Sequence, residues 1–107
     1  MVTQKSVRKL VRDNITKMIR QRGVEPDIFV ATDEEYGTFL KEKLVEEVHE
    51  FLESETVEEL GDILEVIEAL CAWKEFTPTQ LKEVKEHKLQ ERGGFSKKYV
   101  ATFSAPL

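Results

Sequence analysis

The sequence has little of what several protein classes require. Its 107 residues include one cysteine, three prolines and five glycines, and aromatic residues make up 8% of the chain. One cysteine excludes an internal disulfide framework, and with two histidines far apart it offers no zinc-ligand spacing. No apolar run approaches the roughly 18 residues that cross a bilayer, and the first residues lack the apolar stretch of a secretory signal. These absences favour a single cytoplasmic domain over residues 1–107, without membrane contact.

Charge is abundant, and it is segregated along the chain. Charged residues make up 35% of the sequence, with a net charge of −5. Residues 42–68 hold 11 carboxylates and one cation, Lys43, a balance of −10, whereas the other 80 residues hold 15 cations and 10 acids, a balance of +5. Such an acidic centre leaves no continuous basic stripe, which argues against DNA or RNA as a partner.

Apolar residues at helical spacing predict an all-α helical bundle of about four helices. Ser6 is the expected N-cap of the first helix and Asp33 that of the second. A break of three residues, 54–56, separates the second helix from the third, which predicts a central antiparallel hairpin. The expected helices cover residues 6–22, 33–53, 57–74 and 78–92.

The fourth helix has the clearest start signal. Thr77 is placed as its N-cap, Pro78 occupies the first helical position and Gln80 the capping-box position. The helix is expected to end at the glycine pair that follows residue 92. The tail, residues 95–103, alternates weakly and is expected to form a short strand or an arm.

Two pairs of acids have positions that favour a metal site. Glu47 and Glu50 lie on one face of the second helix, and Glu59 and Asp62 on one face of the third, both at i,i+3 spacing. In an antiparallel hairpin the numbers of facing residues have a constant sum, and the pairs Glu50/Glu59 and Glu47/Asp62 share one sum. Four carboxylates at matching heights would repel one another unless a cation lay among them.

The ligand type indicates a hard ion, Mg²⁺ or Mn²⁺, because the cluster contains only oxygen donors. The pattern of a calcium-binding EF-hand is absent, and the spacing of His49 does not fit a di-iron bundle. Acids on helices are also common as solvated surface, and Glu59 has the spacing of a capping-box partner for Thr56. Glu59 nevertheless falls within the apolar arc of its helix, where an unpaired charge is unfavourable.

The same residues resemble a known family. Glu46-Glu47-Val48-His49-Glu50 followed by Glu59-Leu60-Gly61-Asp62 is similar to the E-E-x-x-E…E-x-x-D signature of the MazG-like, all-α nucleoside triphosphate pyrophosphohydrolases. Residues 9–13 (KLVRD) and 91–95 (ERGGF) resemble the ends of the phosphoribosyl-ATP pyrophosphohydrolase-like subgroup. The eight residues between the two acid motifs make a shorter gap than in many members. The resemblance extends from Lys9 to Phe95.

This resemblance implies Mg²⁺-dependent hydrolysis between the α- and β-phosphates of a nucleotide, giving a nucleoside monophosphate and pyrophosphate. It also implies assembly as a homodimer or homotetramer. By motif position, the implied metal ligands are Glu47, Glu50, Glu59 and Asp62. Glu46 is implied either to support those ligands or to act as the base for the attacking water.

An acidic site alone would repel a polyphosphate, so cations are expected nearby. The candidates for substrate binding are Lys9 and Arg12 near the start of the chain, and Lys88 and Arg92 near its end. Local roles are the alternative. Lys9 has i,i+4 spacing to Asp13 and could pair with it, and Lys88 and Arg92 could stabilise the C-terminus of their helix. Lys43 is predicted to be the counter-ion of Glu47, and Trp73 to pack in the core rather than stack on a base.

The sequence therefore predicts a Mg²⁺-dependent nucleotide pyrophosphohydrolase. The alternative with the same chemistry is the phosphoribosyl-ATP pyrophosphohydrolase of histidine biosynthesis. An alternative of another class is a non-enzymatic helical module whose acidic face binds a basic protein, and such a face should tolerate Asp62→Asn.

Overall fold

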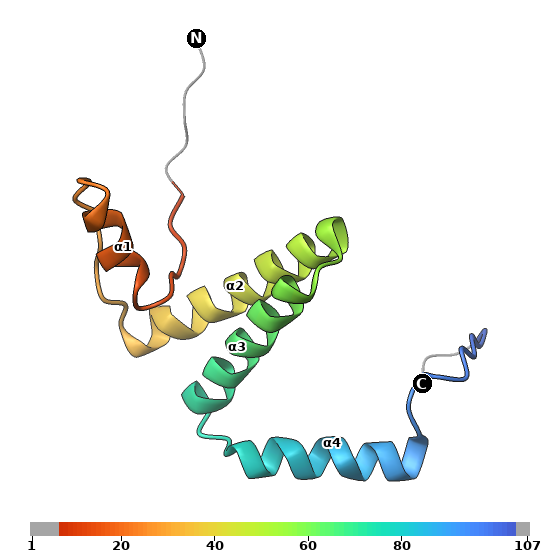
Figure 1. Cartoon of the computed structure of the whole chain (residues 1–107). Coiled ribbons are helices and arrows are strands. Elements are labelled where there is room, and N and C mark those ends of the chain that lie inside the picture. Colours follow the sequence, from red (N-terminus) through yellow and green to blue (C-terminus); the bar gives the residue numbers. More distant parts are fainter. Residues whose placement is uncertain (1–6, 105–107) are drawn as a thin grey trace. The chain divides into compact units, whose positions relative to one another are not determined.

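The computed structural model describes residues 7–104, and this part of the chain is all-helical, as predicted, with four helices and no strand. The helices are α1 (Ile15–Gln21), α2 (Asp33–Ser54), α3 (Val57–Trp73) and α4 (Pro78–Arg92) (Figure 1). The chain divides into two compact units, Met1–Glu75 and Phe76–Leu107. No helix in the described part is long and apolar enough to cross a membrane.

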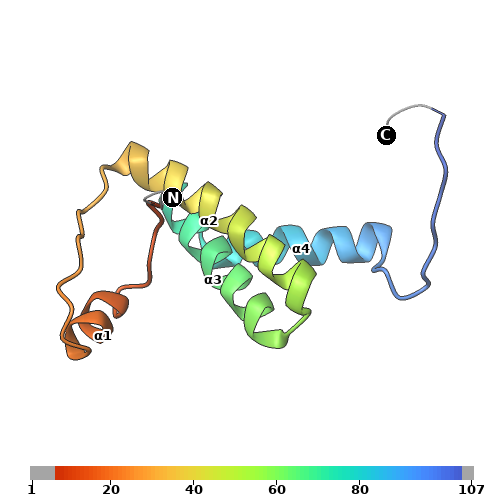
Figure 2. The same cartoon turned by 90° about the horizontal axis from the view of Figure 1, so that it is seen from above.

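The α2–α3 hairpin is the centre of the first unit, and both views show its two helices side by side (Figures 1 and 2). Helix α2 begins with a capping box, because the Thr32 hydroxyl accepts from the Glu35 amide and the Glu35 carboxylate accepts from the Thr32 amide. Thr32 therefore takes the N-cap position predicted for Asp33, which is the first helical residue. Helix α2 ends where Glu55 adopts a left-handed conformation, with φ of 53°.

The core of the hairpin is small. Leu40 and Val66 are the only large apolar side chains that are buried among the described residues. At the open end of the hairpin Trp73 packs against the backbone of Gly37, and its indole N–H donates to the carbonyl oxygen of Asp33 at 3.1 Å. Trp73 thus fastens the end of α3 to the start of α2, which is the packing role that the sequence favoured.

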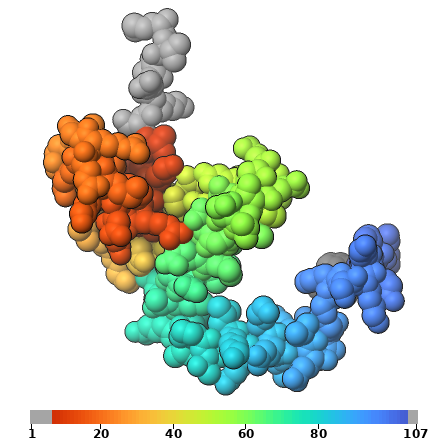
Figure 3. Space-filling view, in the orientation of Figure 1, coloured from red at the N-terminus to blue at the C-terminus, as the bar shows by residue number. Residues whose placement is uncertain are grey.

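The first helix is shorter than predicted. The expected helix over residues 6–22 is observed only as Ile15–Gln21, while its expected cap, Ser6, lies outside the described residues. Asp13 and Asn14 form a turn in place of a helix, in keeping with the tendency of Asp and Asn side chains to compete for backbone hydrogen bonds. Residues 7–12 have no regular secondary structure and lie along the flank of the hairpin, which Lys9 and Arg12 contact (Figure 3).

The second unit contains α4 and the tail. The predicted capping box is present, since Thr77 and Gln80 exchange both hydrogen bonds and Pro78 is the first helical residue. Gly93 ends the helix with φ of 80°. Residues 95–103 contain no strand, so the alternative of an arm describes this tail.

Candidate metal centre

Three of the predicted ligands meet between α2 and α3. Glu47 and Glu50 on α2 and Glu59 on α3 each place one carboxylate oxygen so that all three atoms lie within 4.8 Å of one another. The hairpin register predicted this convergence. Thr56 caps α3 without a side-chain hydrogen bond, so Glu59 does not act as a capping-box partner.

The centre contains polar atoms that the protein leaves unsatisfied. The side chain of Glu47 is only 7% exposed, and its Oε1 lies 3.4 Å from Lys43 Nζ, the predicted counter-ion. Oε2 of Glu47 and Oε2 of Glu59 are buried and have no hydrogen-bond partner. Buried carboxylate oxygens without donors are unfavourable, and either a cation or a shared proton would stabilise these two atoms.

The crowding of the three acids alters the ionisation of Glu59. Burial, followed by the neighbouring Glu47 and Glu50 carboxylates, raises the pKa of Glu59 from 4.5 to about 7. Without a cation, the cluster therefore takes up a proton as the pH falls through about 7. A bound divalent ion would displace this proton.

We expect this shift to make the metal-free protein less stable as the pH rises. Between pH 4.5 and about 7 the folded state binds more protons at Glu59 than the unfolded state, so the free energy of unfolding falls with increasing pH. In EDTA the Tm should decrease from pH 5 to pH 8, and Glu59→Gln should flatten this dependence. Mg²⁺ should raise the Tm more at pH 8 than at pH 5.5. A wild-type Tm that rises over this range, or equal slopes in both proteins, would contradict the expectation.

Glu46 lies beside the cluster between two lysines. Lys9 Nζ is 2.9 Å from Glu46 Oε1, and Lys43 Nζ is 3.2 Å from Glu46 Oε2. The hydrogen bond from Lys9 is the largest cause of a lowered pKa at Glu46, and the same contact raises the pKa of Lys9. The sequence alternative that pairs Lys9 with Asp13 is wrong, because residues 9–13 are not helical and the lysine reaches across to α2.

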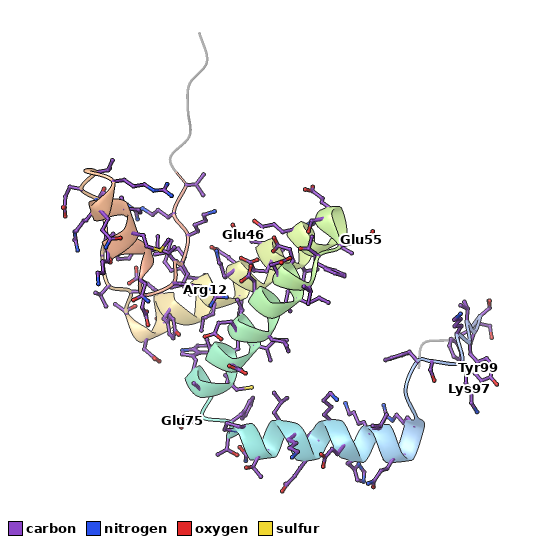
Figure 4. All side chains as sticks on the ribbon, viewed as in Figure 1. Arg12, Glu46, Glu55, Glu75, Lys97 and Tyr99 are labelled. Atoms are coloured by element: carbon purple, nitrogen blue, oxygen red, sulfur yellow. The ribbon has the colours of Figure 1, made fainter. Side chains whose placement is uncertain are left out.

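Asp62, the fourth predicted ligand, is not part of the three-oxygen group. Its Oδ1 accepts a hydrogen bond of 2.7 Å from Arg12 Nη2, and Figure 4 shows Arg12 beside the hairpin. Sequence reasoning chose Arg12 and Lys9 as phosphate-binding cations but missed their acidic partners. These partners lie 50 and 37 residues away, so local spacing carried no signal of them.

The two remaining candidates, Lys88 and Arg92, lie on α4 in the second unit. Both are exposed. Their role in binding substrate stays a prediction.

The donors of the centre fit a hard divalent cation. All three converging groups are carboxylates, and His49 and Cys71 are outside the group. Oxygen-only ligation suits Mg²⁺ or Mn²⁺ better than zinc or copper.

Comparisons with protein-family models, with curated proteins and with solved structures find no match for the chain. The functional interpretation therefore depends on the residues and geometry of this centre.

Proposed function

We propose that this chain is a Mg²⁺-dependent nucleotide pyrophosphohydrolase that cleaves between the α- and β-phosphates, with Mn²⁺ as a possible substitute ion. The observation that supports this function is the convergence of Glu47, Glu50 and Glu59, with two buried oxygens that lack partners. The motifs E-E-x-x-E and E-x-x-D, which resemble the MazG-like signature, supply these residues.

In the proposed reaction the oxygen of water bonds to the α-phosphorus, the phosphoanhydride bond to the β-phosphate breaks, and pyrophosphate leaves the nucleoside monophosphate. Glu47, Glu50 and Glu59 would hold the ion, and Asp62 would join them or remain with Arg12. A bound Mg²⁺ supplies charge neutralisation for the polyphosphate and lowers the pKa of water.

Residues beside the ion would bind the substrate and accept the proton that the attacking water releases. Lys9 and Arg12 can exchange their carboxylate partners for phosphate oxygens, since both cations already lie at the edge of the centre. Glu46 is the proposed acceptor of the proton from the attacking water. Lys9 and Lys43 both lower the pKa of Glu46, and Lys43 would remain beside this carboxylate when Lys9 moves to the phosphate. Glu46 is therefore a weak base, and its contribution should be modest.

The decisive experiment is a panel of substrates incubated with Mg²⁺ and scored for pyrophosphate against orthophosphate. The panel contains the ribo- and deoxyribonucleoside triphosphates and phosphoribosyl-ATP. We expect pyrophosphate and a nucleoside monophosphate from at least one of them, and no turnover in EDTA. Turnover of phosphoribosyl-ATP alone would assign the histidine-pathway alternative. Absence of metal-dependent turnover, together with a basic protein that binds equally to the wild type and Asp62→Asn, would support the binding-module alternative.

We also propose that the protein is a homodimer or homotetramer acting in the cytoplasm, where nucleotides are plentiful. Each helix of the hairpin carries an exposed apolar stripe at i, i+3 and i+7 spacing, and the two stripes lie at matching heights. The stripes consist of Val45, Val48 and Leu52 on α2 and of Val57, Leu60 and Leu64 on α3. A second copy of the hairpin is the partner that these stripes fit best. Light scattering at micromolar concentration tests this proposal, which a monomeric mass would contradict.

A further inference from the structure

Two cavities border the non-helical segment of residues 7–14 within the first unit. One has a volume of about 750 Å³ and the other of about 430 Å³. They share lining residues and therefore adjoin each other along this segment, and we call the two cavities together the groove. The shared residues are Leu10, Val11, Arg12, Asp13 and Tyr36. Each volume by itself is in the range of sites that hold small organic ligands.

The larger cavity has an aromatic wall. Phe29, Tyr36 and Phe39 line it, and the Phe29 and Phe39 rings meet edge to face at a centroid distance of 6.2 Å. The guanidinium of Arg8 lies 5.6 Å from the Phe29 centroid. Phe29 is 52% exposed, so its ring is open to solvent and to a ligand. Aromatic rings with a stacked guanidinium are the groups on which nucleobases pack, because every base presents a π-face.

The smaller cavity leads to the metal centre. Glu47, Asp62 and Lys43 line it, together with Arg12 from the shared wall. Glu47 is one of the three converging carboxylates, and Arg12 bonds to Asp62. The aromatic wall of Phe29 and Phe39 belongs to the larger cavity alone, and Glu47 is the member of the metal centre that lines the smaller one.

The aromatic side chains at one end of the groove and the carboxylates at the other set the direction in which a ligand would bind. We propose that the cavity walled by Phe29, Tyr36 and Phe39 is the nucleobase subsite of the groove, so that the base stacks there and the phosphates pass Arg12 toward Glu47. Arg8 then stabilises the stacked base, and Arg12 lies at the junction where base and phosphates are joined through the sugar. The inference takes its ligand class, a nucleotide, from the proposed function.

Binding can be tested without metal and without turnover. AMP, GMP, CMP and UMP are titrated in EDTA into protein whose phenylalanine rings are labelled with ¹³C. At least one nucleotide should shift the ring resonances of Phe29 and Phe39, while those of Phe76 and Phe103 stay in place. Saturation transferred from the protein should be greater at the base protons than at the ribose protons. These measurements use the unaltered chain, so they do not depend on the folding of a variant.

A matched pair of variants completes the test. Phe29→Ala should weaken binding of the responding nucleotide about tenfold, and Phe29→Trp should retain it. Phe76 has the same exposed fraction as Phe29, 52%, and lines neither cavity, so Phe76→Ala should leave affinity unchanged. The inference is overturned when no nucleotide shifts Phe29 or Phe39, or when Phe29→Ala binds as the wild type does. A chain that binds nucleotides at these rings but hydrolyses none overturns the proposed function alone.

Discussion

Substitution of Glu47 by glutamine is expected to lower the affinity for Mg²⁺ at least about 100-fold. Loss of a group that merely supports a metal ligand typically costs 10- to 100-fold in metal affinity, and in the proposed centre Glu47 is a ligand itself. Pyrophosphate release in the substrate panel should fall to background. Isothermal titration with Mg²⁺ and the panel assay measure the two effects separately.

The same variant should fold at least as well as the wild type in EDTA. Glu47 Oε2 is buried without a partner near two other carboxylates, and the isosteric amide removes one of these like charges. Lys43 keeps its contact with Glu46. Glu53→Gln is the matched control, because Glu53 is exposed on α2 and lies outside the converging group. If Glu47→Gln binds Mg²⁺ with wild-type affinity, the metal centre is assigned to the wrong residues.

Substitution of Gly37 by alanine is expected to destabilise the protein by about 2 kcal/mol. A Cβ at this buried position would overlap the six-membered ring of Trp73, so the indole would have to move. That movement would break the hydrogen bond from the indole to Asp33 and open the end of the hairpin. The gain of up to about 1 kcal/mol from better helix propensity does not compensate. Urea denaturation in EDTA measures the difference.

Gly61→Ala is the matched control for this effect. Gly61 also lies inside a helix, α3, and a Cβ there would meet no atom within 4 Å. Helix propensity then acts alone, and the variant should be more stable by about 0.5–1 kcal/mol. Equal effects of the two substitutions would show that Trp73 does not depend on close approach to Gly37.

The hairpin could be predicted from the sequence because its signals are local. Apolar spacing defined α2 and α3, and the short break fixed how they face each other. That register brought Glu50 opposite Glu59 with no knowledge of the structure, and the structure places both within the group that also contains Glu47. The N-terminal cap of α4 could be predicted in the same way, because its signal lies in four consecutive residues, 77–80.

The surroundings of the centre could not be predicted in the same way. Residues 7–14 have helical spacing, yet a short isolated helix is marginal in water, and the segment instead bonds through Lys9 and Arg12 to the hairpin. Those contacts join residues far apart in the chain. They also explain why Asp62 is engaged by Arg12 and stands apart from the other three acids.

The small core has a consequence for how the free energy of unfolding varies with temperature. The heat-capacity change on unfolding scales with the apolar area that becomes exposed, and in the described residues only Leu40 and Val66 are large apolar side chains that are buried. A single copy should therefore have a flat stability curve and a broad thermal transition. Because apolar burial contributes little to the free energy of unfolding, a ligand that binds with even a modest free energy would supply a large share of that quantity.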